Sequence, residues 1–407
     1  MKQKMPRRYI TAFFICVIFT CLAGGCAVPV KPPPVIPKPE IVKIASLDYP
    51  EFYDDMAYDG LEYAILQSIA YLNKIPPDRK FRFGNDTFNA SHMIRSMNHF
   101  LNFIQIKPTK KSLKKFLKTN YLVYRSIGHD QKGKVLFTGY YEPHLRGTLK
   151  KTAEYRYPVY ARPSDLASID LSSFSSKFKG EKIIGRYANS TFMPYFDRGE
   201  IEREGAIENR AEKIAWLRDP VDLFFLQVQG SGRIYLDNGT SINVHYHATN
   251  GRPYRSIGKL LIEEEKIPRS QMSMQKIRAY LREHPEETEA ILDYNPSYVF
   301  FKIEKDGPLG CLEVKLTPGR SVALDRRIFP LSALAFIKTK KPVLDGDGNI
   351  HNWTDLRRFV LNQDTGGAIQ GPGRADLFWG NGTYAEIAAG HMQHPGTLYF
   401  LILKPDA

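Results

Sequence analysis

The stretch VDLFFLQVQGSGRIYLDNGTSINVHY, residues 221–246, is the most direct indication of the fold class. It consists of short apolar runs separated by Gly, Asn and Asp, as is typical of strands joined by tight turns. Asp237-Asn238-Gly239 separates Arg233–Leu236 from Ser241–Tyr246, and an Asn-Gly pair between two such runs predicts a β-hairpin. We interpret residues 226–232 as a further strand that ends in a glycine turn and carries two glutamines on one face.

Similar runs occur on both sides of this stretch, from Gly133 onward. We expect strands in KVLFTGYYEP (134–143), YRYPVYARP (155–163), SYVFFKI (297–303), GCLEVKL (310–316), SVALD (321–325) and GTLYFLILK (396–404). Helical spacing predicts two amphipathic helices, over 91–104 and 110–126, and a helical interlude over 256–293. The pattern therefore predicts a mainly β protein with a few helices, closer to a barrel than to alternating βα units.

The first residues, MKQKMPRRYITAFFICVIFTCLAGGC, have the features of an export signal. Four cationic residues precede an apolar run from Tyr9 to Leu22, which is shorter than the roughly 20 residues of a membrane-spanning helix. The box Ala23-Gly24-Gly25-Cys26 resembles a lipoprotein processing site. We therefore expect a signal peptide over residues 1–25 and a lipid on Cys26, with simple cleavage as the alternative.

The mature chain would begin with a tether. Residues 26–40 are rich in proline, which favours an extended, stiff backbone that holds the folded part away from its anchor. Because Cys16 and Cys21 lie in the signal, Cys311 is the sole cysteine in the folded part, and the mature chain contains no internal disulfide.

The balance of charge restricts the class of partner. The formal net charge of +14 includes four cationic signal residues, so the mature chain carries 14 − 4 = +10. An anionic lipid surface or an acidic polymer would suit such a chain. Nucleic acid is disfavoured by export and by the lack of a dense basic stripe, and we interpret Lys110-Lys111 and Lys114-Lys115 as the solvated face of a helix.

Candidate catalytic residues gather near the C-terminus, in QDTGGAIQGPGRADLFWG (363–380). Asp364 and Asp376 lie twelve positions apart across a glycine-rich loop and could face one cleft. Asp325 is a third candidate, since it ends an apolar strand, although a pair with Arg326 or Arg327 explains it equally well. Aspartate beside glycine is common in ordinary turns, so these residues alone leave the function open.

Two further segments combine aromatic and amide side chains, which suit the apolar faces and hydroxyl groups of sugars. The candidate sugar-binding residues are Thr138, Tyr140, Tyr141, Gln227, Gln229, Gly230 and Ser231. Each segment could also be a well-packed hairpin.

Taken together, these segments resemble the MltA-type membrane-bound lytic murein transglycosylases, glycoside hydrolase family 102. The resemblance extends from about Val135 to Leu403. It is carried by FTGYYEP (137–143), FMPYFDRGEIE (192–202), WLRDPVDLFFLQVQGSGRI (216–234), HATNGRPYRSIGKLL (247–261), NPSYVFF (295–301), LDRR (324–327), QDTGGAI (363–369) and GRADLFWG (373–380).

The resemblance implies a double-psi β-barrel domain with a second β domain inserted into it. On this sequence the barrel would comprise residues 41–142 and 304–407, and the insert residues 143–303, with a groove for a glycan strand between them. It also implies that the candidate sugar-binding residues line this groove.

The resemblance further implies a reaction. The β-1,4 bond between N-acetylmuramic acid and N-acetylglucosamine in peptidoglycan would be cleaved without water, forming a 1,6-anhydro end. Asp376 would be the single general acid and base, and Asp364 and Asp325 would complete a three-aspartate pattern. One carboxyl group can suffice because the attacking 6-hydroxyl belongs to the sugar itself.

Two other functions stay open: a hydrolytic muramidase with Asp364 and Asp376 as a carboxylate pair, and an inactive peptidoglycan-binding lipoprotein. We expect no cofactor and no metal, because the histidine pairs 245/247 and 391/394 lack a carboxylate or cysteine at ligand spacing. The expected partners are glycan strands and a membrane reached through the lipid. We expect a monomer at the periplasmic face of the outer membrane, and membership of cell-wall enzyme complexes is left open.

Overall fold

The computed structural model describes residues 39–406, which belong to one compact unit. The expected signal peptide, the lipidation site at Cys26 and most of the expected tether lie outside the described residues. Among the described residues, no helix combines the length and the apolar character needed to cross a membrane.

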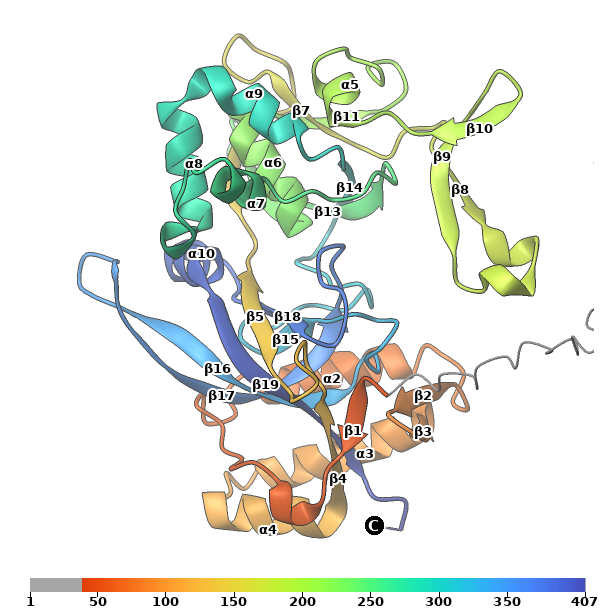
Figure 1. Ribbon diagram of the computed structural model, residues 1–407, viewed down its shortest axis with the longest axis vertical. Coiled ribbons are helices and arrows are strands. Elements are labelled where there is room, and N and C mark those ends of the chain that lie inside the picture. Colours follow the sequence, from red (N-terminus) through yellow and green to blue (C-terminus); the bar gives the residue numbers. More distant parts are fainter. Residues whose placement is uncertain (1–38, 407) are drawn as a thin grey trace, which may run out of the picture. The chain divides into compact units, whose positions relative to one another are not determined.

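Six strands form a closed barrel at the centre of this unit (Figure 1). Each strand is hydrogen-bonded to the next in the order β19-β16-β17-β15-β18-β5, and β5 pairs again with β19. The strands are β5 (Val135–Tyr140), β15 (Ser321–Ala323), β16 (Leu334–Leu344), β17 (Ile350–Asp364), β18 (Arg374–Phe378) and β19 (Gln393–Leu403). The expectation of a mainly β protein with a barrel and a few helices is confirmed, and the double-psi connection of its strands stays a prediction.

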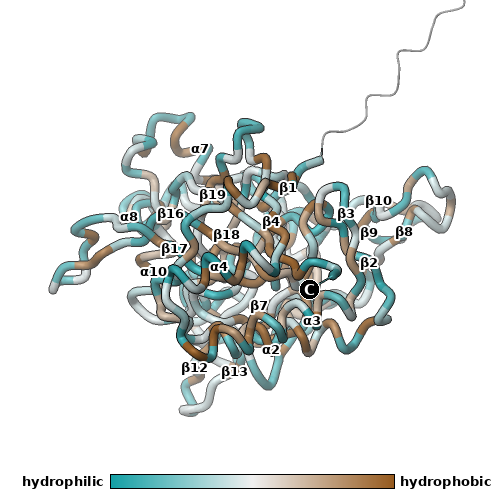
Figure 2. The backbone as a smooth tube through the Cα atoms, turned by 90° about the horizontal axis from the view of Figure 1, so that it is seen from below, coloured by the Kyte–Doolittle hydropathy of each residue, from teal (hydrophilic) through white to brown (hydrophobic). Residues whose placement is uncertain are grey.

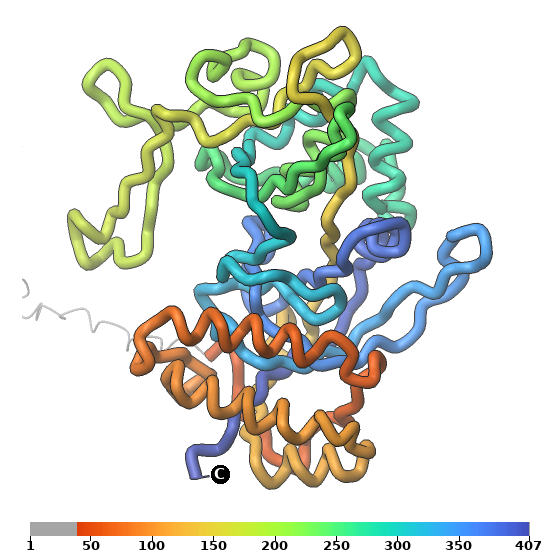
Figure 3. Tube along the Cα trace, turned by 180° about the vertical axis from the view of Figure 1, so that it is seen from behind, coloured from red at the N-terminus to blue at the C-terminus, as the bar shows by residue number. Residues whose placement is uncertain are grey.

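Further elements pack around the barrel. β4 (Tyr121–Ser126) and β1 (Ile41–Lys43) extend the sheet from β19, and β2 (Lys80–Phe83) and β3 (Asp86–Asn89) form a small hairpin. The helices are η1 (Ser46–Asp48), α2 (Leu61–Leu72), α3 (Ala90–Ile104), α4 (Lys110–Asn120) and α10 (Gly382–His391). α2 and α3 run side by side in Figure 3, and their buried residues join the barrel in the main hydrophobic core.

The middle of the chain forms separate sheets. A six-stranded sheet has the order β14-β13-β12-β6-β11-β7, and β10-β9-β8 form a three-stranded sheet. The strands are β6 (His144–Thr148), β7 (Tyr157–Tyr160), β8 (Ala167–Asp170), β9 (Lys182–Ala188), β10 (Thr191–Pro194), β11 (Lys213–Leu217), β12 (Ser231–Leu236), β13 (Ser241–Thr249) and β14 (Val299–Glu304). The helices are η2 (Leu171–Ser173), η3 (Ser176–Phe178), α5 (Arg198–Glu202), α6 (Pro220–Gln229), α7 (Ile257–Glu263), η4 (Arg269–Gln271), α8 (Met274–Glu283) and α9 (Pro285–Asp293). The expected domain limits at 142/143 and 303/304 stay a prediction.

Several predicted elements are confirmed. β12 and β13 form the hairpin around Asp237-Asn238-Gly239, with Tyr235 opposite Ser241. α3 occupies the first predicted helix, and its N-cap Asn89 accepts a hydrogen bond from the backbone N–H of His92. The interlude over 256–293 contains three α-helices.

Three predictions are wrong. The predicted helix over 110–126 ends at Asn120 and continues as β4, because the aromatic and β-branched residues after it favour a strand. Residues 226–229 belong to helix α6 instead of a strand, since Asp219 caps a helix that has Pro220 in its first turn and Gly230 at its end. Residues 310–316 form no strand and contribute only an isolated bridge between Leu309 and Lys315.

Candidate functional site

Two of the predicted aspartates lie in one row across three neighbouring strands. Ala323 of β15 pairs with Asp364 of β17 on one side and with Asp376 of β18 on the other. Asp376 in turn pairs with Thr138 of β5. Because neighbouring strands are about 4.8 Å apart, the Cα atoms of the two aspartates are separated by roughly 10 Å. The barrel therefore brings together residues that are far apart in the sequence.

This row faces away from the main hydrophobic core. In β18, Ala375 and Leu377 are completely buried in that core, so Asp376 between them points to the opposite face. There a small apolar cluster of Tyr140, Leu316, Ala323 and Phe378 forms a separate buried patch. The aspartates thus stand beside an apolar floor that withdraws them partly from water.

Asp376 has few hydrogen-bond donors around it. The Thr138 hydroxyl donates to its Oδ1 at 2.8 Å, and Arg374 Nη2 donates to the Thr138 oxygen at 3.3 Å. Burial raises the pKa of Asp376 from the ordinary 3.8 to about 6, and the charge of Asp364 adds to the rise. The hydrogen bond from Thr138 and the charge of Arg374 oppose the rise without cancelling it.

Asp364 is surrounded by more donors. The backbone N–H groups of Cys311 and Thr365 donate to its Oδ1, each at 2.9 Å. The Tyr140 hydroxyl donates to Oδ2 at 2.8 Å. Burial raises the pKa of Asp364 to about 6, and these three hydrogen bonds oppose the rise. Three donors surround the Asp364 carboxyl group and one donor contacts that of Asp376, so hydrogen bonding favours the ionised form of Asp364 more strongly than that of Asp376.

The third predicted aspartate has a different environment. Asp325 is buried and accepts two side-chain hydrogen bonds from Arg327, at 2.9 and 2.7 Å. Its Oδ2 also accepts from the backbone N–H of Gly371 at 2.8 Å. Burial tends to raise the pKa of Asp325, but these hydrogen bonds outweigh it and lower the pKa. Asp325 thus fastens the loop between the other two aspartates.

The two tyrosines of the 137–143 motif lie in different surroundings. Tyr140 lies beside Asp364, whereas Tyr141 lines a pocket of about 660 Å³ whose lining residues include none of the three aspartates. Arg278, Asp222 and Glu386 line the same pocket. The backbone N–H of Tyr141 donates a hydrogen bond to Oε1 of Gln229, another predicted sugar-binding residue, at 2.9 Å.

The residues predicted from 227–231 are placed by the end of α6. Gln227 is buried, and its Oε1 accepts a hydrogen bond from Arg198 Nη2 at 2.6 Å. Gln229 bridges to Tyr141, as described above. Gly230 has a left-handed φ of 79° that ends the helix, and Ser231 is buried at the start of β12. These contacts join Gln227 to helix α5 and Gln229 to the residue that follows β5.

Two contributors to the site were not predicted. Arg374 lies two residues before Asp376 on the same strand, so strand alternation places it on the same face and could have identified it. Cys311 contributes its backbone N–H to Asp364. No side-chain pattern reports such a contact, because it depends on the path of an irregular loop.

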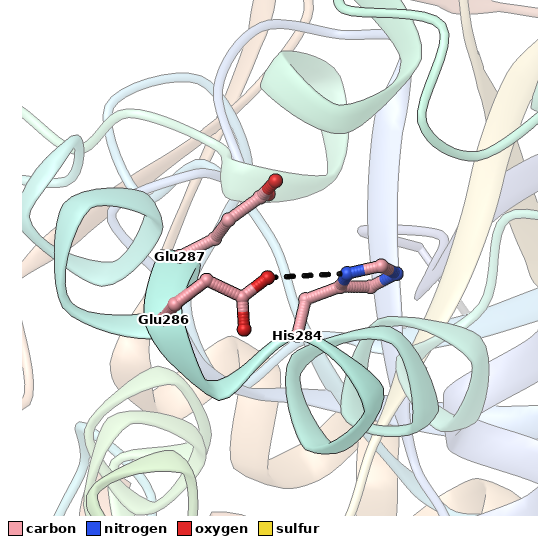
Figure 4. A group of neighbouring side chains, drawn as sticks. All are labelled: His284, Glu286 and Glu287. Carbon is pink, nitrogen blue, oxygen red and sulfur yellow. Dashed lines mark ion pairs between the residues drawn. The ribbon is translucent and has the colours of Figure 1, made fainter.

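Two of the histidines considered as metal ligands, His391 and His394, have other contacts. His391 Nδ1 lies 2.9 Å from the carbonyl oxygen of Ile387, and the His394 ring lies 3.9 Å from that of Trp353. Within residues 39–406, the group with the spacing of a metal site is His284, Glu286 and Glu287 (Figure 4). Glu287 Oε2 already accepts from Lys266 Nζ and the Tyr280 hydroxyl, both at 2.8 Å. This group is explained by ion pairs at the start of α9.

Comparisons with known proteins agree with the geometry. Residues 136–302 match the MltA specific insert domain, and residues 320–402 match the 3D domain. The chain is 34% identical over 286 residues to membrane-bound lytic murein transglycosylase A of Escherichia coli K12, covering 69% of each sequence. The structure resembles that of a membrane-bound lytic murein transglycosylase from Agrobacterium tumefaciens, with a TM-score of 0.72 and 30% identity, covering 89% of this chain and 98% of that one.

It also resembles the structure of E. coli MltA with bound chitohexaose, with a TM-score of 0.68 and 25% identity, covering 90% of this chain and 96% of that one. The sequence relatives and the solved structures point to the same family. The chain belongs to the family of the membrane-bound lytic murein transglycosylases A.

Proposed function

We propose that this enzyme is a peptidoglycan lyase that cleaves the β-1,4 bond between N-acetylmuramic acid and N-acetylglucosamine and forms a 1,6-anhydro end. The observation that carries the proposal is the placement of Asp364 and Asp376 in one row across the barrel strands. The pKa values of both carboxyl groups are raised, and the two groups have unequal numbers of hydrogen-bond donors. Family membership supports the substrate class, and the chitohexaose bound by the E. coli relative supports a glycan ligand.

Asp376 is the proposed general acid and base. With a pKa of about 6, about one molecule in ten carries the proton on this group at pH 7. The protonated carboxyl donates to the glycosidic oxygen as the bond to the anomeric carbon breaks. The resulting carboxylate then takes the proton of the sugar's 6-hydroxyl, whose oxygen attacks the anomeric carbon. The proton balance closes within one turnover, so no second acid is needed.

We propose that Asp364 and its hydrogen-bond donors stabilise the transition state electrostatically. An ionised Asp364, held by Cys311, Thr365 and Tyr140, stabilises the positive charge that grows on the sugar ring in the transition state. The same charge favours the protonated form of Asp376. Thr138 fixes the orientation of the Asp376 carboxyl through its hydrogen bond.

The other predicted residues receive weaker roles. We propose that Asp325 positions the 365–373 loop through Gly371. Tyr141, Gln229, Gly230 and Ser231 remain proposed borders of a groove between the barrel domain (41–142 and 304–407) and the insert (143–303). Gln227 is proposed to act through Arg198, as support for α6.

We also propose that a lipid on Cys26 holds the enzyme at the periplasmic face of the outer membrane. The signal sequence and the cysteine box support the anchor. The relatives named as membrane-bound support the location.

The pH dependence tests the division of roles. We expect the initial rate of sacculus digestion to fall above about pH 6, tending toward tenfold per pH unit, because Asp376 must start protonated. In Asp364→Asn the negative neighbour is lost, so the pKa of Asp376 falls and this limb moves to lower pH. Profiles of kcat/KM from pH 4 to 8 measure both effects. The control variant Asp237→Asn changes an exposed turn and should leave the pH at which the rate falls unchanged. If this pH were also unchanged in Asp364→Asn, the proposed coupling between the two aspartates would be contradicted.

Product analysis separates the proposed reaction from hydrolysis. Mass spectrometry of digested sacculi should show fragments whose muramic acid ends are each one water lighter than reducing ends, because the 6-hydroxyl replaces water as the attacking group. Digestion in ¹⁸O-labelled water should leave these ends unlabelled. Labelled reducing ends would establish the hydrolytic muramidase, and the absence of any fragment would favour the inactive binding lipoprotein.

A further inference from the structure

Helix α4 carries a basic surface that the proposed reaction does not use. The surface consists of the exposed Lys107, Lys110, Lys111, Lys114 and Lys115 and the half-buried Lys118, here called the lysine surface. The five lysines within α4 follow i, i+1, i+4, i+5 and i+8, so they form one stripe, while Leu113 and Leu117 are buried on an adjacent face. Within the described part of the chain, none of these six lysines forms an ion pair with a carboxylate.

The segment beside α4 adds exposed aliphatic side chains. Ile106, just before α4, is 72% exposed, and Leu47 of η1 is 87% exposed. The segment after η1 runs along the helix, since the Tyr49 hydroxyl donates to the Tyr121 carbonyl at 2.8 Å. The nitrogen of Lys110 lies 4.3 Å from the centre of the Tyr53 ring. Lysines flanked by exposed aliphatic side chains suit the boundary between lipid headgroups and acyl chains.

The charge of this region is only weakly offset. Asp48 and Glu51 are the acidic residues of the neighbouring segment, and Glu51 pairs with Arg357 at 3.1 Å. Lys404 adds a further cation, because its Nζ donates to the carbonyl oxygens of Lys118 and Thr119 at the end of α4. A positive surface with little compensation attracts an anionic surface.

The lysine surface and the aspartate row lie at opposite ends of β19. Tyr121, directly after α4, pairs with Leu403 at one end, and Thr138 of the aspartate row pairs with Gln393 at the other. These 403 − 393 = 10 steps of about 3.3 Å separate the two sites by roughly 33 Å. Figure 2 looks at the end of the molecule on which α4 lies.

The point at which the chain enters the folded part is compatible with a membrane at this end. β1 pairs with β4, Ile41 lying opposite Ser126, so the entry is within about 20 Å of α4 along β4. The 13 residues from 26 to 38 span at most about 45 Å. A lipid on Cys26 therefore allows α4 to reach the lipid surface.

We propose that the lysine surface docks on the anionic phospholipid headgroups of the membrane that holds the chain. The docked enzyme then presents its aspartates roughly 30 Å from the lipid, toward the cell wall. This inference rests on the proposed anchoring through Cys26. Flotation therefore measures the anchoring independently of the lysine labelling.

The test is lysine acetylation of the mature lipidated chain, from Cys26 onward, on two kinds of vesicle, phosphatidylcholine alone and phosphatidylcholine with phosphatidylglycerol. Peptide mass spectrometry follows the extent of labelling. We expect labelling of Lys111, Lys114 and Lys115 to fall at least about threefold on the anionic vesicles, and high salt to restore it. Lys177 and Lys179, exposed and without ion pairs among the described residues, serve as reference positions and should label equally on both.

A variant sharpens the result. Lys111→Gln/Lys115→Gln should lose most of the protection at Lys114, whereas Lys177→Gln/Lys179→Gln should keep it. Equal labelling of the lysine surface on both vesicles would overturn the proposal. So would protection by soluble glycan fragments without vesicles, which would assign the surface to the wall polymer. Flotation with the phosphatidylcholine vesicles reports the anchor by itself, and digestion of sacculi reports the proposed reaction.

Discussion

Asp376→Asn should digest peptidoglycan about 10³-fold more slowly than the natural enzyme while still binding glycan. The amide has the same shape as the carboxyl and can still accept the hydrogen bond from Thr138, but it cannot give a proton to the glycosidic oxygen. Initial rates of release from sacculi, with binding of a chitooligosaccharide measured by calorimetry, check the two halves of this prediction. If the variant digested peptidoglycan at the wild-type rate, Asp376 would not be the general acid.

Stability distinguishes this variant from a misfolded one. The pKa of Asp376 in the folded state, about 6, is above its ordinary value of 3.8, so its contribution to stability is fully present below pH 3.8 and is lost as pH rises through 6. Asp376→Asn removes the cost of an ionised carboxyl beside the apolar floor. We therefore expect the variant to be more stable than the natural protein at pH 8, by about 1–2 kcal/mol, with a smaller difference at pH 5. Thermal unfolding at the two pH values measures this.

Asp54→Ala should destabilise the fold by about 3–5 kcal/mol. The side chains of Asp54 and Arg320 are both completely buried, and their two hydrogen bonds measure 2.6 and 2.8 Å. Asp54 also accepts from the backbone N–H of Phe359 in β17, so it fastens the N-terminal segment to the barrel. Without it the guanidinium remains buried without its counterion. Urea unfolding followed by circular dichroism gives the free energy of unfolding.

An exposed ion pair is the matched control for this prediction. Lys340 and Asp355 are 2.6 Å apart, with side chains 45% and 47% exposed, so Asp355→Ala should cost at most about 1 kcal/mol. The double variant Asp54→Leu/Arg320→Met should recover much of the loss, because no charge is then buried. If Asp54→Ala were no more harmful than Asp355→Ala, the buried pair would not hold the segment as described.

The fold class and several elements could be predicted because their signals are local. The Asn-Gly turn identified the β12–β13 hairpin, and the apolar spacing identified α3. α6 was missed although Asp219, Pro220 and Gly230 are start and stop signals of a helix, because the apolar run between them obscured its period. β4 was merged with α4 because no glycine or proline separates the end of the helix from the start of the strand.

The two neighbouring aspartates of the candidate site could be named from the sequence, but their arrangement and two of the surrounding residues could not. The motif around Asp376 and Asp364 pointed to both aspartates through the family resemblance. Their common partner Ala323, the donors around Asp364 and the attachment of Asp325 to Gly371 arise from strand register and loop path, which depend on long-range packing. Asp325 illustrates this difference. Its position in the sequence suggested either a catalytic role or an ion pair with Arg326 or Arg327. In the structure it pairs with Arg327 and accepts a hydrogen bond from Gly371 in the loop.

The way the barrel holds its aspartates has a consequence for evolution. Asp364 and Asp376 are both aligned to Ala323 by strand pairing, so the ladder fixes the distance between them and the connecting loop does not. Insertions or deletions between the two strands can therefore accumulate without moving the reacting groups, as long as an anchor like that of Gly371 on Asp325 survives. Distant relatives should thus keep the strand register while the number of residues between their aspartates drifts, and a motif search that demands a fixed interval would overlook them.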